Sequence, residues 1–324
     1  MRRWKTRGRK TDRPGGGRPG MTLFRFFIMI LCLVSPLLFS GAVQADDPWT
    51  GPRIMNEVSR RHEPFPYRYE ELTMILRDRA RNRDVRKARR FSRVEEDGSI
   101  KVLLVFDTPL EIRGVALEGT GHASGLWEWR LYLPAFGKRL LSYDGRAGSD
   151  RFLGTDFTVM DLRAEALSDF RYVRAADQKI DLAACYVIEA VPRDREVERM
   201  TGYSLRRHFV RQDNFFIVRT DYYGRLKRFF KRQTFRDLKR VDGDTWHADM
   251  ILMENIRERH ITLIKTDRRV FSRDYVPPEI FTSSWLLENR HIQASEKILF
   301  QGDFGIPSPS GPGPERPADA NTDP

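Results

Sequence analysis

The chain has 324 residues, of which 40% are hydrophobic and 31% charged, so it is long enough to build a sizeable hydrophobic core. Its formal net charge of +12 comes mostly from the N-terminus. Nine of the 57 Lys/Arg and one of the 45 Asp/Glu lie in residues 1–45, which leaves +4 for residues 46–324. Residues 46–324 are thus weakly basic, with positive and negative side chains interspersed. This charge distribution gives no strong indication that the partner is a nucleic acid.

The first element in chain order is an export signal. Basic residues precede an apolar run of fourteen residues at 26–39, which is shorter than the roughly 20 residues that a spanning helix needs. The small residues Val43 and Ala45 follow it. This order is typical of a secretory signal peptide, so we expect cleavage after about Ala45 and export to the periplasm, with Met21 as a second candidate start. Left uncleaved, the segment would be an N-terminal anchor.

The two cysteines lie on different sides of this cleavage site. Cys32 belongs to the signal peptide, and Cys185 is alone in residues 46–324, so the mature chain cannot form an internal disulfide. The run Leu182–Ile188 around Cys185 is apolar, and free cysteine packs as a small hydrophobic residue. We therefore expect Cys185 to be buried, and an exposed reactive thiol is the alternative.

The hydrophobic period changes from helix to strand near Tyr67. Residues 50–62 have Ile54, Met55 and Val58 at helical spacing, which predicts a short helix. After Tyr67 the period is two, which predicts strands near 67–77, 83–93, 101–106 and 112–117. Further strands are predicted at 126–133, 139–143, 170–175, 182–191, 204–211, 215–223, 226–238, 244–256 and 259–269.

The strand at 126–133 has the clearest alternation. Its large apolar residues are predicted to face one way, and these are Trp127, Trp129, Leu131 and Leu133. The intervening residues are predicted to face the other way, and these are Glu128, Arg130 and Tyr132. Pro134 cannot donate to a ladder, so it ends the strand.

We interpret the pattern as about ten strands in mostly antiparallel order, with a helix at each end (50–62 and Glu279–Asn289) and none between consecutive strands. This excludes a parallel α/β fold. It predicts a mainly β (α+β) fold, in which one strongly curved antiparallel sheet forms an incomplete β-barrel. Residues 46–300 are predicted to form one domain, and the Pro/Gly-rich tail 301–324 is predicted to be disordered.

Signatures of catalysis are absent from the sequence. The six histidines are scattered without a metal spacing, Ser124 is misplaced for a nucleophile elbow, and there is no phosphate-binding loop. Four acids near residue 150 could form a catalytic carboxylate pair, and they are Asp144, Asp150, Asp156 and Asp161. Acids in a polar loop more often cap helices and form turns. We therefore expect no enzyme activity, no metal and no cofactor.

Aromatic residues are plentiful, with 21 Phe, 10 Tyr and 6 Trp, and many lie on alternating strands. Two interpretations remain open on the residues alone. The aromatic residues could form an ordinary core between sheet and helices, or they could line an apolar lumen that holds a lipid chain.

Several motifs in order resemble one bacterial family. They are Phe106-Asp-Thr-Pro-Leu-Glu-Ile-Arg-Gly114, Trp129-Arg-Leu-Tyr-Leu-Pro-Ala135, Asp150-Arg-Phe-Leu-Gly-Thr-Asp-Phe157 with Asp161-Leu162, Cys185-Tyr-Val-Ile-Glu189 and Tyr222-Tyr-Gly-Arg-Leu226. Over about residues 52–290, the chain resembles the outer-membrane lipoprotein-sorting proteins, which are similar to periplasmic lipoprotein carriers of the LolA/LolB type. Its family-motif residues are Tyr132, Pro134, Gly154, Asp156, Phe157 and Asp161.

The resemblance implies an incompletely closed antiparallel barrel with lid helices, no cofactor and no reaction. Relatives bind lipid-modified proteins or other amphipathic lipids, and many act beside inner-membrane exporters of the resistance-nodulation-division (RND) type. It implies a carrier of lipid or lipoprotein acyl chains that has no nucleic-acid partner and could contact the membrane peripherally. Val159 and Met160 depart from the family pattern, which usually has an aromatic–acid pair between Phe157 and Asp161.

We predict one set of lumen residues for such a carrier, and for each of them the alternative is plain core packing. The set is Trp127, Trp129, Leu131, Leu133, Leu104, Phe106, Val187 and Phe216. Two other functions remain as alternatives. One is a non-carrying interaction or sensor module of the envelope with the same fold, and the other is a lipid hydrolase, which would need a convergent site that the sequence does not show.

Overall fold

The computed structural model describes residues 48–62, 65–122, 125–136, 139–143, 151–162 and 165–293. These residues belong to a compact unit that begins at Asp47. The predicted signal peptide and the tail 301–324 lie outside the described residues. Within the described ranges, no helix is both long enough and apolar enough to cross a membrane.

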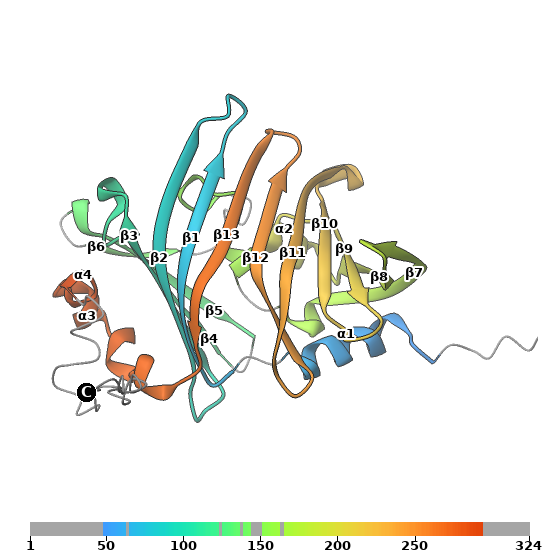
Figure 1. Cartoon of the computed structure of the whole chain (residues 1–324), viewed down its shortest axis with the longest axis horizontal. Coiled ribbons are helices and arrows are strands. Elements are labelled where there is room, and N and C mark those ends of the chain that lie inside the picture. Colours follow the sequence, from blue (N-terminus) through green and yellow to red (C-terminus); the bar gives the residue numbers. More distant parts are fainter. Residues whose placement is uncertain are drawn as a thin grey trace, which may run out of the picture. The chain divides into compact units, whose positions relative to one another are not determined.

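A single antiparallel sheet of thirteen strands dominates the structure (Figure 1). Its strands run in the order β6-β5-β4-β3-β2-β1-β13-β12-β11-β10-β9-β8-β7, so the first and last strands of the chain pair at the centre. The strands are β1 Tyr67–Arg77, β2 Arg83–Val94, β3 Ile100–Thr108, β4 Ala116–Gly121, β5 Trp127–Leu133, β6 Arg139–Tyr143, β7 Phe170–Ile180, β8 Ala183–Pro192, β9 Leu205–Arg211, β10 Ile217–Tyr223, β11 Phe229–Asp242, β12 Thr245–Asn255 and β13 His260–Val270.

The predicted fold class is confirmed, because the protein is mainly β with one antiparallel sheet that does not close. In the described part of the chain, the outermost strands β6 and β7 do not pair with each other. The described part of the chain has thirteen strands rather than about ten, and each overlaps one of the thirteen ranges predicted from the sequence. The range 112–117 was displaced, because β4 begins only at Ala116 and runs to Gly121.

The sheet has an inner face that we define by a row of paired residues. Leu72 of β1 pairs with Ala88, and Ala88 pairs with Phe106 of β3. Directly paired residues point to the same side of a sheet. These residues join one hydrophobic cluster with Phe152 and Phe157, which belong to the segment 151–162 that crosses the inner face. This segment contains two short 3-10 helices, η3 (Phe152–Gly154) and η4 (Val159–Leu162).

Helix α1 (Gly51–Arg61) covers the inner face near β8 and β9, and its prediction at 50–62 is confirmed. Its buried residues Ile54 and Met55 pack on Ile188 of β8 and Val210 of β9. Gly51 lets the helix approach β7 closely, because a Cβ there would lie 2.8 Å from the carbonyl oxygen of Tyr172.

The C-terminal segment packs on the outer face of β1 to β5. It consists of η7 (Arg273–Tyr275), η8 (Pro278–Phe281), α3 (Ser283–Leu287) and α4 (Arg290–Gln293), at the lower left of Figure 1. Ile280 and Leu286 are buried there against Leu103 and Tyr132. The single helix predicted at 279–289 is wrong, because Thr282 is extended and its hydroxyl caps α3 by accepting from the backbone N–H of Trp285.

A second correction concerns the connection between β8 and β9. No helix was expected there, but α2 spans Arg195–Thr201. Asp194 caps it by accepting from the backbone N–H groups of Glu196 (2.9 Å) and Val197 (3.0 Å). Gly202 ends it with a φ of 76°. An Asp cap followed by a Gly stop is a readable helix signal, but the segment is short enough to pass for a turn.

Candidate functional site

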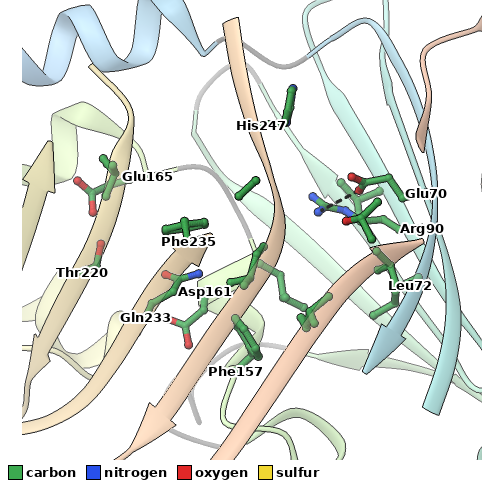
Figure 2. A pocket seen from close by; sticks show the side chains of 18 of the residues that line it. Glu70, Leu72, Arg90, Phe157, Asp161, Glu165, Thr220, Gln233, Phe235 and His247 are labelled. Carbon is green, nitrogen blue, oxygen red and sulfur yellow. Dashed lines mark ion pairs between the residues drawn. The ribbon is translucent and has the colours of Figure 1, made fainter. Parts of the chain in front are cut away.

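A cavity of about 360 Å³ lies between the inner face of the sheet and the crossing segment. This volume falls in the range of small-molecule sites, which begins at roughly 300 Å³. Its floor on the sheet is apolar and includes Leu72 and Leu104, and Phe157 adds apolar surface from the crossing segment. Figure 2 shows charged side chains on either side, with Glu70 and Arg90 opposite Glu165.

Three of the predicted lumen residues line this cavity, namely Leu104, Trp129 and Phe216. Four others join the same hydrophobic cluster without lining the cavity, and these are Phe106, Trp127, Leu131 and Leu133. Val187 is the exception. Its neighbours Tyr186 and Ile188 pack under α1, so Val187 points to the other face of β8, where it is buried with Cys185 and Phe209.

Trp127 and Trp129 lie flat on β4 because that strand has glycines beneath them. The two rings are stacked at 5.1 Å with an angle of 13° between their planes. A Cβ on Gly119 would lie 2.4 Å from the ring of Trp129, and one on Gly121 would lie 2.5 Å from Trp127. Among the described residues, the buried indole nitrogen of Trp129 has no hydrogen-bond partner, so it is a spare donor beside the cavity.

One side of the cavity carries what we call the arginine cluster, which is Arg68, Arg90 and Arg269 around the buried Glu70. Arg269 holds Glu70 tightly, with 2.7 Å between Nε and Oε1, and it also binds Asp249. The other two contacts to Glu70 Oε2 are long: 3.7 Å from Arg68 Nε and 3.6 Å from Arg90 Nη1.

The electrostatic field of this cluster is positive. Burial by itself would raise the pKa of Glu70, but the charges of Arg68, Arg90 and Arg269 lower it to about 2. Burial and then the charge of Arg68 lower the pKa of Arg90 to about 10. Burial, Arg68 and Arg269 lower the pKa of His247, another lining residue, to about 4. Cations therefore exceed anions on this wall of the cavity.

The opposite wall carries a second cluster around Glu165, and there the charges balance. Glu165 accepts from Arg206 Nη1 at 2.6 Å and from the hydroxyl of Tyr172 at 2.7 Å, and His208 Nε2 lies 3.4 Å away. Burial would raise the pKa of Glu165, but His208 and Arg206 hold it below its usual value. The Arg206 guanidinium also lies over the ring of Tyr203 at 5.1 Å.

The family-motif residues of the crossing segment anchor it to the sheet. Asp161 accepts from Lys231 Nζ at 2.7 Å and from the hydroxyl of Tyr203 at 2.8 Å. Asp156 is held by Thr262 and His260, at 2.8 Å and 2.6 Å. The two acids thus fix the segment that roofs the cavity.

The other motif residues have different places. Phe157 lines the cavity, and Gly154 adopts a φ of 75° that favours glycine. Pro134 begins η2 (Pro134–Phe136) after β5. Tyr132 lies on the outer face, where its hydroxyl donates to Asn289 Oδ1 at 2.7 Å.

The sequence interpretation missed both charged clusters. A signal was present, because Glu70 stands in phase with Leu72 and Met74, and Arg90 in phase with Ala88, on strands whose inner residues are otherwise apolar. A charged residue in phase with a buried face is unusual.

A second hollow, of about 810 Å³, is lined by residues of β1, β2 and β3 and by Gly114 and Ile292. Its lining combines charged residues such as Lys87, Asp107 and Arg113 with apolar ones such as Val105 and Phe106. No group of three or more His, Cys, Asp or Glu within the described ranges could hold a metal ion.

A family model described as "Uncharacterized protein" matches residues 98–288, which is more than half of the chain. No curated protein matches the chain. Among solved structures, the chain is similar to an outer membrane lipoprotein-sorting protein domain from Vibrio parahaemolyticus. The TM-score is 0.67 with 25% identity, and the match covers 73% of this chain and 98% of that one.

Two further solved structures share the fold. A DUF1329 family protein from Desulfovibrio piger gives a TM-score of 0.64 with 21% identity, and it covers 72% of this chain and 98% of its own. A LolA superfamily protein from Nitrosomonas europaea gives a TM-score of 0.56 with 18% identity, again over 72% of this chain and 98% of its own. The resemblance found in the sequence motifs is therefore confirmed as a LolA-like fold.

Proposed function

The chain belongs to the family whose model matches residues 98–288, its fold is LolA-like, and on this premise we propose that it carries a lipid or the acyl chains of a lipoprotein in its inner-face cavity. The observation that carries the proposal is the apolar lining made by Leu72, Leu104 and Phe157 between charged walls. Apolar cavities with a few convergent polar groups are the usual form of a ligand site.

The energetics suit a chain-like ligand. Each methylene moved from water into an apolar site contributes about 0.8 kcal/mol. Eight buried methylenes would therefore contribute on the order of 6 kcal/mol before the cost of immobilising the ligand. A ligand bound in this way can be released to a partner that offers an equally apolar site.

The carrier is proposed to work in the periplasm, as an exported protein whose signal peptide is removed near Ala45. A solved structure with 25% identity to this chain is described as an outer membrane lipoprotein-sorting protein domain, which supports an envelope location. An inner-membrane RND-type exporter remains a proposed partner that follows from the motif resemblance alone. We propose no catalytic role for the chain.

The proposal is tested by binding of the uncharged fluorescent probe N-phenyl-1-naphthylamine. We expect one molecule to bind per chain and to be displaced by lipids extracted from a bacterial envelope. Ile251 lines the cavity, so Ile251→Trp fills part of it and is expected to weaken binding at least tenfold. Ile256 is 48% exposed and does not line the cavity, so Ile256→Trp is the matched control.

Absence of probe binding to the wild-type chain, or equal binding by both variants, would contradict a carrier role. It would favour the alternative in which this fold serves as an interaction or sensor module of the envelope.

A further inference from the structure

The arginine cluster holds more positive charge than its own acids neutralise. Arg269 is fully engaged by Glu70 and Asp249, at 2.7 Å each. Arg68 and Arg90 share only the remaining oxygen of Glu70, at distances of 3.7 and 3.6 Å that are too long for hydrogen bonds. Two guanidinium groups on the cavity wall are therefore left with unused donors.

One of these unused donors is withdrawn from solvent. Arg68 Nε is buried and has no hydrogen-bond partner among the residues that the structure describes. His247 Nε2, on the same cavity, is likewise buried and unpartnered in the described part of the chain. Leaving a buried donor unpaired destabilises a protein, and the cost is larger for a charged group. A buried cation that keeps such a vacancy is typical of a site that receives an anion.

The register places this charge directly beside the apolar floor. Glu70 and Leu72 are successive inner-face residues of β1, and Arg90 pairs with Leu104 of β3, which is part of the floor. Directly opposite residues of antiparallel strands have Cα atoms only about 4.5 to 5.5 Å apart. An anionic group at Arg90 would therefore have its apolar tail over Leu72 and Leu104.

The opposite wall also has buried nitrogens without a hydrogen-bond partner in the described part of the chain, Arg206 Nε and His208 Nε2, but its arginine is already paired at close range. There, Arg206 and Glu165 form a close pair at 2.6 Å, with Tyr172 on the second carboxylate oxygen. The wall at Glu165 is closed to a further anion by the carboxylate itself. The asymmetry between the two walls indicates the direction in which a ligand would lie.

We propose that Arg68 and Arg90 form a headgroup subsite, so that the cargo is an amphipathic lipid with a carboxylate or phosphate head held by these arginines and an acyl tail on the apolar floor. The inference rests on the carrier function proposed above and adds the chemical class and the orientation of the cargo. Arginine suits this role because its planar fork matches carboxylate and phosphate oxygens in two simultaneous hydrogen bonds.

The test is displacement of bound N-phenyl-1-naphthylamine by four competitors: laurate, dodecyl phosphate, dodecanol and inorganic phosphate. We expect laurate and dodecyl phosphate to displace the probe at concentrations at least tenfold below that of dodecanol, because hydrogen bonds between charged groups are stronger than those of a neutral hydroxyl. Inorganic phosphate alone is expected to displace nothing at these concentrations.

Arg68→Met and Arg90→Met keep the apolar stem of each side chain and remove its charge. Each is expected to raise the laurate concentration needed for displacement about tenfold and to leave dodecanol unchanged. Arg83→Met is the matched control, because Arg83 lies exposed on the same strand β2 and does not line the cavity. Arg269 is left intact in all variants because it holds the buried Glu70. Circular dichroism and the midpoint of thermal unfolding verify that each variant folds.

The outcomes separate the two proposals. If dodecanol and laurate displace the probe equally, or if Arg83→Met acts like the cavity variants, the headgroup subsite is wrong while the carrier function stands. If inorganic phosphate competes as well as laurate, the cluster is an anion site without a tail, and the inference is also wrong. If no competitor displaces the probe, or the probe does not bind, the carrier function itself fails.

Discussion

Lys231 of β11 donates a hydrogen bond to Asp161 of the crossing segment, with 2.7 Å between Nζ and Oδ2, and both side chains are almost wholly buried. Tyr203 shares the site, with its hydroxyl bonded to Asp161 and in contact with Lys231. Burial would raise the pKa of Asp161, but the Lys231 ammonium and its hydrogen bond hold it below the usual value. This buried pair joins the roof of the cavity to the sheet.

Breaking the pair should destabilise the protein strongly. Asp161→Asn or Lys231→Met leaves one buried charge without its partner, which costs about 3 to 5 kcal/mol. The double variant Asp161→Leu/Lys231→Met removes both charges and should recover most of that loss. Urea unfolding measures all three. Glu196→Gln, at the exposed pair with Arg199, is the control and should cost less than about 1 kcal/mol. A double variant no more stable than the single ones would contradict this account.

Helix α1 should depend on its two buried residues. Ile54 is completely buried against β8 and β9, so Ile54→Ala should lower the free energy of unfolding by about 2 to 5 kcal/mol. Amide hydrogen exchange in residues 51–61 should accelerate if the loss is local to the helix. Ile256→Ala, at an exposed position, is the control and should change little. Unchanged exchange in Ile54→Ala would show that α1 is held by other contacts.

Gly114 should be essential for docking of the C-terminal segment. Its φ is 80°, and a Cβ would lie 2.4 Å from Ile292. The carbonyl oxygen of Gly114 also contacts the segment, because His291 Nε2 lies 2.9 Å from it. Gly114→Ala should therefore expose the segment 278–293 to limited proteolysis. Gly98→Ala has a similar φ of 78° but meets nothing within 4 Å, so it separates backbone strain from the clash. Equal proteolysis of Gly114→Ala and Gly98→Ala would show that the clash with Ile292 does not undock the segment.

Stability should fall in two steps as the pH is lowered. Burial lowers the pKa of His62, His247 and His291, that of His247 to about 4. Between pH 6.5 and 4 the unfolded chain therefore binds protons that the folded chain does not, and stability decreases. Glu70, with a pKa lowered to about 2, contributes stability that is present above the unfolded value near 4.3 and is lost toward pH 2.

Thermal unfolding from pH 7.5 to 3 checks this dependence. His247→Gln should reduce the loss of thermal stability between pH 6.5 and 4, and it should leave the loss below pH 4 unchanged. His122→Gln is the control, because His122 is exposed on the strand-end loop. A midpoint that stays constant from pH 6.5 to 4 in the wild-type chain would contradict the assignment of the histidines.

The sheet could be predicted from the sequence because its information is local. The alternation of Trp127, Trp129 and Leu131 fixes the face of β5, and Tyr132 correctly falls on the opposite face. The expected burial of Cys185 is also confirmed, and burial raises the pKa of its thiol. Val187 was misplaced because a one-residue error in phase moves a side chain to the other face.

The arginine cluster could not be predicted in the same way. Glu70 and Arg269 are 199 residues apart and meet only because β1 pairs with β13 at the centre of the sheet. Glu165 and Arg206 meet because an irregular segment crosses the inner face, and such a segment has no hydrophobic period to read. The two charged clusters therefore could not be predicted from the sequence, because they depend on long-range strand pairing and on irregular backbone.

The most direct test of the central claim is native mass spectrometry of the protein purified without detergent from a bacterium that exports it, followed by lipid extraction. We predict a stoichiometric adduct that dissociates on activation and proves to be an acyl lipid with an anionic head. A chain that arrives empty, and stays empty after incubation with envelope lipids, would contradict the carrier function.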